Sequence, residues 1–369
     1  MTLNQKFNRW IFDSYRISPE NLGLFRIIYA LYFLFINGLP KFEWIAAYPN
    51  ALFTPPIGIA RFFPGFPPEL VLNAFGYIIA LLFIFLLFGY KTRFVSLAIT
   101  CVAVLAKSFD YSLGKICHDL LPWMIPFVMS FSNWGAAYSI DAKKGLANKE
   151  VASWPITWMS IILGFAMFTA GYPKMMGGWM MLDSLAVKNY LLSQYFVHEN
   201  TQLLASFFVN IESPIVWEFF DWAPIIFEIG FLAAIIRPSI FRAFTIIALT
   251  FHLMNMLILN IGFEMFAILY LLFWAPLFSV NHTRIASYFN KIKPAFIVAF
   301  GLLYMTMFHF IADRPLLIVT DAVGIDYIYV AVATWAIPIL IFMILGVRYV
   351  KKHGVINSLT RVWKVNYTA

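Results

Sequence analysis

Long apolar runs alternate with short polar segments along the chain, and ten of these runs approach the length needed to cross a bilayer. Two further segments, around 182–190 and 203–209, are apolar without reaching a full span, which favours re-entrant or interfacial elements. The pattern predicts an all-α, polytopic integral membrane helical bundle. The ten expected spans are 20–39, 69–89, 93–108 (short and tilted), 116–133, 155–172, 214–236, 239–259, 262–280, 294–312 and 326–347.

Composition supports this class of protein. Of the 369 residues, 62% are hydrophobic and 12% are charged, which excludes an ordinary soluble globular chain. The net charge of +8 comes from basic residues dispersed among loops, so it indicates membrane orientation and no nucleic-acid partner. The N-terminus and alternate loops hold 18 Lys and Arg against 7 on the other side. This asymmetry predicts a plasma or inner membrane protein with both termini in the cytoplasm. The first 18 residues lack an apolar core, so we expect no cleavable signal peptide.

The segment Ala170–Trp179 ends one apolar run with small residues, a proline and a lysine. Gly171 and Pro173 favour a helix break, because glycine lacks a Cβ and proline lacks an N–H. Lys174 is then expected at the outer lipid–water boundary. An amine partly removed from water holds its proton less tightly and can serve as a general base. The alternative is a lysine that reaches for water beside the interfacial Trp179.

Ionisable residues inside the predicted spans are further candidates, because charge in lipid is costly. Arg26 is either a cytoplasmic anchor or a member of an interior ion pair. His118 opens the fourth predicted span, where a helix N-terminus favours neutral imidazole. Its alternative is a capping histidine. Neither Cys101 nor Cys117 has metal-ligand spacing, so we expect no metal site.

Glu218, Asp221 and Glu228 lie at offsets that place them on one stripe of the sixth predicted span. Structural pairing and a proton path explain this stripe equally well. His252 lies deep in the seventh predicted span, and Asn255 shares its face three residues later. An interior hydrogen-bonded pair that joins helices is the alternative to a catalytic role. No phosphate-binding loop, serine-hydrolase motif or dinucleotide fingerprint occurs.

Together these segments resemble the HTTM membrane domain of the vitamin K-dependent gamma-glutamyl carboxylase family. The similarity extends over about residues 20–280. Five short motifs carry it, in order: Leu24-Phe25-Arg26-Ile27; His118 with the later Trp134…Tyr138-Ser139-Ile140-Asp141; Ala170-Gly171-x-x-Lys174-Met175-x-x-x-Trp179; Glu228 as a membrane acid; and Phe251-His252-x-Met254-Asn255 with Ile261-Gly262-x-x-x-Phe266.

The resemblance implies a concrete chemistry. In the family a reduced quinone of the vitamin K or menaquinol type reacts with O2, and a lysine begins the reaction by removing a quinol proton. The base formed then deprotonates a peptide glutamate, and CO2 traps the carbanion. By this resemblance we expect Lys174, His118 and His252 to be catalytic. Asn255, Trp179 and Tyr172 are expected to contact the cofactor, and Arg26, Glu228 and Asp141 to be structural or ion-pairing.

The chain also departs from the family. Carboxylases carry a large soluble domain after the membrane part, whereas this chain continues into two apolar runs, so we divide it at 1–280 and 281–369. We therefore expect a membrane enzyme that modifies or matures an exported peptide or small molecule with a reduced quinone. The rival is a non-catalytic transporter, immunity or maturation-assistance protein that uses the same expected outward-opening cavity of the helical bundle for binding only.

Overall fold

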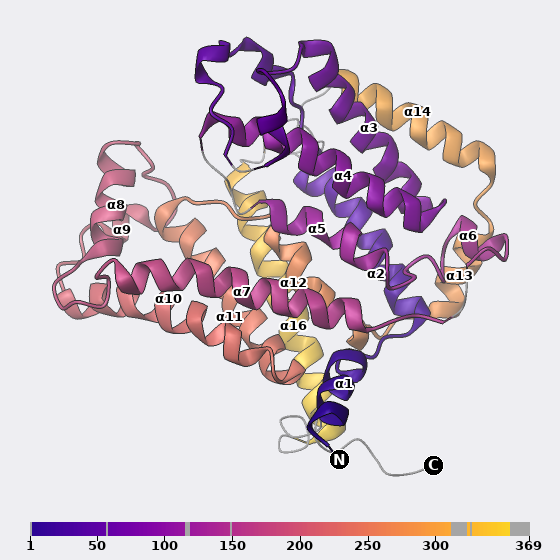
Figure 1. Cartoon of the computed structure of the whole chain (residues 1–369). Helices are drawn as coiled ribbons and strands as arrows, with labels where there is room; N and C mark the ends of the chain where they lie inside the picture. The colour runs from indigo at the N-terminus through magenta and orange to yellow at the C-terminus, as the bar shows by residue number, and fades with distance from the viewer. Residues whose placement is uncertain are drawn as a thin grey trace. The chain divides into compact units, whose positions relative to one another are not determined.

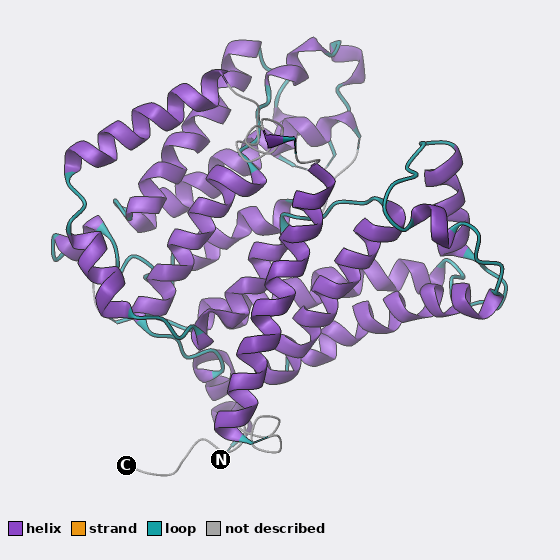
Figure 2. Ribbon diagram, turned by 180° about the vertical axis from the view of Figure 1, so that it is seen from behind, coloured by secondary structure: helices purple, strands orange, loops and turns teal. Residues whose placement is uncertain are grey.

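A computed structural model describes residues 2–56, 58–114, 119–147, 150–310, 323–324 and 327–354. Over these residues the chain is helical and contains no strand (Figure 2). It forms two compact units. Unit 1 comprises Met1–Tyr15, Ile156–Leu277 and Asp326–Ala369, and unit 2 comprises Arg16–Pro155 and Phe278–Ile325. The chain is thus grouped differently from the expected division at residue 280.

Six helical segments among the described residues are long and apolar enough to cross a membrane, which confirms the expected class of an all-helical membrane protein. The span expected at 93–108 is confirmed, but it is not short, because α4 (Thr92–Asp110) continues through η5 (Tyr111–Leu113) for 22 residues. The other five segments are α2 with its π-helical end η1 (Pro19–Asn37), α3 (Glu69–Phe88), α7 (Trp154–Met176), α11 (Pro238–Leu259), and Ile328–Lys352 within α16 (Tyr327–His353).

The remaining four expected spans are helical but differ from a simple crossing. Helices α5 (Leu120–Met129) and α14 (Pro294–Phe310) have 10 and 17 residues, and α10 (Pro214–Ala234) contains three carboxylates. Helix α12 (Phe266–Trp274) with η6 (Ala275–Leu277) ends within unit 1, and α13 (His282–Asn290) belongs to unit 2. A count of ten spans therefore stays a prediction.

In unit 2 the helices α2, α3, α4 and α5 pack successively, and α14 lies against α3 (Figure 1). Their core is aromatic: Phe33 and Trp123 are buried with ring centroids 4.7 Å apart, and the Tyr29 hydroxyl donates to the Pro122 carbonyl at 3.0 Å. Short elements complete the unit: η2 (Glu43–Ala47), η3 (Asn50–Leu52), η4 (Ile59–Phe62) and α6 (Ile140–Lys143).

In unit 1 helix α11 packs against α10, α12 and α16. Figure 1 shows α7 running beside α10. Helices α8 (Ala186–Phe196) and α9 (Ala205–Phe208) lie where the sequence predicted re-entrant or interfacial elements, and both contact α11. Trp217, Leu191 and Ala205 form a buried cluster there. The N-terminal helix α1 (Leu3–Asp13) also belongs to this unit.

Candidate functional site

The helix that carries Lys174 does not break at Gly171 or Pro173, so that prediction is wrong. Helix α7 continues to Met176 and contains Pro173 in its final turn. The proline removes a single amide donor from this turn, whereas the following residues supply others. The Gly177 amide donates to the Pro173 carbonyl at 2.8 Å, and the Trp179 amide donates to the Lys174 carbonyl at 3.2 Å. The helix end at Gly177 therefore places Lys174 in the last turn.

Lys174 is held by a carboxylate and does not extend freely to water. Its Nζ lies 2.5 Å from Oε1 and 2.8 Å from Oε2 of Glu228. The side chain of Lys174 is 26% exposed and that of Glu228 only 4%. The ammonium also lies 5.6 Å from the centre of the Trp179 ring, a cation–π distance. The result is one amine and one carboxylate in a shared, mostly dry environment.

Two glycines bring α7 close enough to α10 for this pair to form. A Cβ at Gly171 would lie 2.8 Å from the Cβ of Glu228, and one at Gly164 would lie 2.4 Å from Cδ1 of Ile235. The two glycines are seven residues apart and so share one helix face. Small residues at such positions let helix backbones approach in membranes. Lys174, three residues after Gly171, consequently lies beside Glu228.

His252 is buried, 7% exposed, among aromatic rings from α11, α12 and α16. Its Nε2 lies 2.9 Å from the Tyr270 hydroxyl, and its ring stacks on Trp335 with centroids 5.0 Å apart. The buried Trp335 indole N–H has no acceptor among the described residues. No hydrogen bond between the side chains of His252 and Asn255 is found in the described part of the chain, whereas Tyr270 is a hydrogen-bond partner of the histidine.

The Lys174–Glu228 pair and the aromatic site around His252 both belong to unit 1. The Tyr270 hydroxyl contacts His252, and it lies within electrostatic range of the Glu228 carboxylate. Phe227 directly precedes Glu228 and Phe251 directly precedes His252, and the centroids of these two rings lie 5.6 Å apart. The Lys174–Glu228 pair and the hydrogen-bonding groups around His252 therefore belong to one packed region of α7, α10, α11, α12 and α16.

The other carboxylates of the α10 stripe are bound by backbone amides. Asp221 is fully buried and accepts from the Ser184 hydroxyl and from the amides of Ala186 and Val187, all at 2.8–2.9 Å. Glu218 Oε1 accepts from the Asp183 amide at 2.7 Å. These contacts fix the start of α8 against α10, so two of the three acids hold the fold together.

Arg26 and Asp141 lie in unit 2 and organise its turns. Arg26 is fully buried, which rules out the anchor interpretation, and donates to the Tyr138 carbonyl. Asp141 accepts from the Lys91 amide and from the amide and hydroxyl of Thr92 at 2.7–2.9 Å, and so caps α4. Arg26 and Asp141 attract each other electrostatically. Burial, followed by the nearby Glu20 carboxylate, raises the pKa of Tyr138.

Two predicted site residues, His118 and Tyr172, remain to be located, and two residues of the site were not predicted. His118 falls in 115–118, outside the described residues. Tyr172 is 44% exposed and stacks on Phe168 with ring centroids 5.6 Å apart, and among the described residues it makes no hydrogen bond with Lys174. Tyr270 and Trp335 were missed. The available signal was a hydroxyl and an indole within strongly apolar runs, where polar groups need partners.

The fold and site together define a polytopic helical membrane protein with a paired lysine and an aromatic-enclosed histidine. No protein-family model, curated protein or solved structure gives a significant match to the chain.

Proposed function

We propose that this protein is an HTTM-like integral membrane enzyme that uses the Lys174–Glu228 pair to remove a proton from a reduced quinone. In this proposal it modifies or matures an exported peptide or small molecule. The observation that carries the proposal is the pair formed by the Lys174 amine and the Glu228 carboxylate, whose nitrogen and oxygen lie 2.5 Å apart in the same unit as the buried His252.

The pair gives the protonated Lys174 a way to become a neutral amine. A proton can pass from Nζ of Lys174 to a carboxylate oxygen of Glu228, leaving a free amine and a neutral carboxylic acid. The low polarity around the nearly buried Glu228 reduces the cost of this transfer, because burial removes solvation from the charged groups. The amine can then accept a hydroxyl proton and become ammonium again, so the net proton acceptor is Glu228. General bases of this kind contribute about 10²–10⁴-fold to a rate.

The residues around His252 fit a quinone. The Trp335 N–H is a buried donor without a described acceptor, and His252 and Tyr270 can orient oxygen atoms beside it. A buried donor left unpaired is costly, and a ligand carbonyl would satisfy it. When bound, a reduced quinone supplies the electrons for reaction with O2, with CO2 as a further co-substrate. The aromatic surroundings suit its apolar ring and exclude water.

The membrane arrangement belongs to the same proposal. We place about ten spans across a plasma or inner membrane, with cytoplasmic termini and α8 and α9 at the outer interface. Lys174 would then face the side on which an exported peptide is found. The excess of basic residues in alternate loops supports this orientation.

Replacing Lys174 by Ala tests the catalytic proposal. In proteoliposomes with a reduced menaquinone, the variant should lose quinol oxidation and O2 uptake by at least about 100-fold. Lys188→Ala is a matched control in the same unit, because Lys188 also lies over a tryptophan, 5.9 Å from the Trp217 ring. Mass spectrometry of co-purified peptides should show a CO2-sized gain with wild type only. Wild-type rates in Lys174→Ala would refute the proposal.

A transporter using the acidic stripe is the rival from another class. It is less well supported, because Asp221 and Glu218 are occupied by amides of the α8 region. It predicts proton-coupled flux without chemical change in any substrate, which the same proteoliposomes would reveal.

A further inference from the structure

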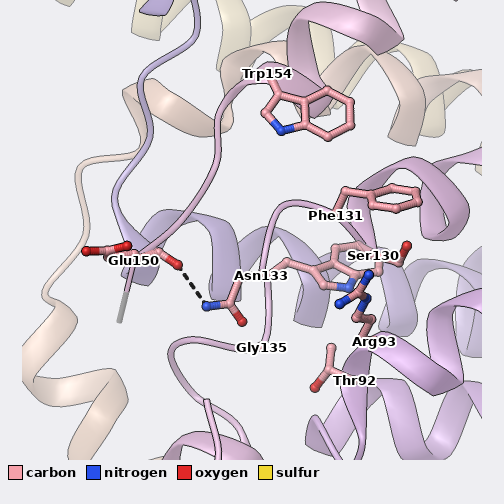
Figure 3. A pocket seen from close by; sticks show the side chains of 9 residues that line it. Thr92, Arg93, Ser130, Phe131, Asn133, Gly135, Glu150 and Trp154 are labelled. Carbon is pink, nitrogen blue, oxygen red and sulfur yellow. Dashed lines mark hydrogen bonds between the residues drawn. The ribbon is translucent and has the colours of Figure 1, made fainter. Parts of the chain in front are cut away.

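Unit 2 contains a cavity that the proposed function does not use. Its volume is about 330 Å³, and it is formed where α4 begins, α5 has just ended and α7 is about to start (Figure 3). Its principal side chains are those of Arg93, Ser130, Phe131, Asn133, Trp134 and Trp154. The cavity thus combines one cation with three aromatic rings.

The walls of the cavity are fixed by hydrogen bonds. Asn133 adopts a left-handed backbone conformation with φ 60°, and its Nδ2 donates to the Glu150 carbonyl at 2.8 Å. The Ala152 amide donates to the Ser132 carbonyl at 3.1 Å, which ties the segment before α7 to the segment after α5. Trp134 is buried and donates to the Ser96 hydroxyl at 3.0 Å. The cavity is therefore shaped before any ligand arrives.

Arg93 gives the cavity a positive charge that the described residues leave uncompensated. Its guanidinium lies 5.8 Å from the centre of the Phe131 ring, and no hydrogen bond or ion pair joins it to a described residue. Figure 3 shows the Glu150 carboxylate directed away from Arg93, and the nearby Asp141 carboxylate is bound by Lys91 and Thr92. A planar guanidinium with free donors matches a phosphate group.

The position of the cavity indicates whether the phosphate belongs to a lipid headgroup or to a soluble molecule. Helices α4 and α7 are both long enough to cross a membrane, and both begin at this cavity. It therefore lies near the membrane boundary, where aromatic side chains meet lipid headgroups. Phe131 and Trp154, whose ring centroids are 5.9 Å apart, offer an apolar wall beside the cation. Inorganic phosphate has no apolar part that could contact this wall, whereas a phospholipid has a glycerol backbone and acyl chains that could.

We infer that this cavity binds the phosphate headgroup of an anionic phospholipid. Arg93 hydrogen-bonds the phosphate, and Phe131 and Trp154 contact the glycerol and the first acyl carbons. Loops on this side also carry the predicted excess of basic residues, which favours anionic lipid.

Native mass spectrometry of the full chain with phosphatidylglycerol or phosphatidylcholine tests the assignment. Wild type should prefer phosphatidylglycerol, and Arg93→Gln should bind it about tenfold more weakly, since a hydrogen-bonded charge is lost. Arg284→Gln is the matched control: Arg284 lies 5.7 Å from the Tyr288 ring and does not line the cavity. Arg93→Lys keeps the charge and should give intermediate binding. Equal binding by wild type and Arg93→Gln, or equal losses in both arginine-to-glutamine variants, would overturn the inference.

A second arm separates lipid from soluble phosphate. Trp154→Ala should weaken phosphatidylglycerol binding, and a large excess of inorganic phosphate should not displace the lipid from wild type. Full displacement by inorganic phosphate together with unchanged lipid binding by Trp154→Ala would overturn the lipid assignment.

Discussion

Two lysines near the ends of membrane-length helices are paired with carboxylates, one in each unit, and the pairs differ in charge balance. Lys107 in α4 contacts two carboxylates, Asp119 at 2.5 Å and Asp110 at 3.1 Å. The Tyr111 hydroxyl adds a hydrogen bond to Asp119. Lys174 in α7 contacts the single carboxylate of Glu228.

This difference separates a structural role from a chemical one. If Lys107 gave up its proton, one of two neighbouring carboxylates would stay negative in a partly buried site, so its ammonium is the stable form. The Lys174–Glu228 pair has no excess charge and becomes neutral when one proton crosses 2.5 Å. Chemistry that needs a free amine is therefore expected at Lys174 and not at Lys107.

Of the substitutions that test this difference between the two lysines, Glu228→Gln should have the largest effect on the rate of quinol oxidation. The amide cannot take the proton of Lys174, so quinol oxidation should fall by about 100-fold at neutral pH. In the variant the lysine can lose its proton only to solvent, so the rate should rise with pH more steeply than in wild type. A pH–rate profile of both proteins measures this.

Asp119→Asn is the control for that experiment. It removes a carboxylate from Lys107 and should leave the pH–rate profile unchanged. A profile altered by Asp119→Asn as much as by Glu228→Gln would mean that the two lysines do not differ in role.

Much of this fold could be predicted from the apolar runs, because a bilayer demands long apolar helices whatever their packing. Lys174, Glu228 and His252 could also be singled out, since polar groups in such runs need partners. Their pairing could not, because it depends on how closely α10 approaches Gly171.

A long-range contact and a proline inside a helix account for the remaining differences. The contact of Trp335 with His252 joins residues 83 positions apart in the sequence, which no local pattern records. The continuation of α7 through Pro173 also departs from local propensity, because a proline near the end of a helix usually stops it.

Lys107→Met should reduce stability more than activity. The change leaves Asp110 and Asp119 facing each other without a cation, and breaking such a partly buried pair should lower the free energy of unfolding by about 2 kcal/mol. Lys174→Met should cost less, because Glu228 alone can be protonated. Thermal unfolding in detergent compares the two, and a larger loss for Lys174→Met would contradict the structural role given to Lys107.

Gly171→Ala should give the smallest effect and tests how the Lys174 pair is assembled. Unlike Asp110, which lies on the same helix as Lys107, Glu228 reaches its lysine from another helix through the contact at Gly171. The added methyl group would meet the Cβ of Glu228 at 2.8 Å, which is too close, so α10 must move. We expect a loss of about 1 kcal/mol in the free energy of unfolding, after the better helix propensity of alanine is counted.

Gly301→Ala in α14 is the matched control, because its nearest neighbour, Cγ2 of Ile84, lies 3.9 Å away. That control should be neutral or slightly stabilising, with unchanged quinol oxidation. If Gly171→Ala matched Gly301→Ala in both stability and rate, the close approach of α7 and α10 would not be what holds the amine against its carboxylate.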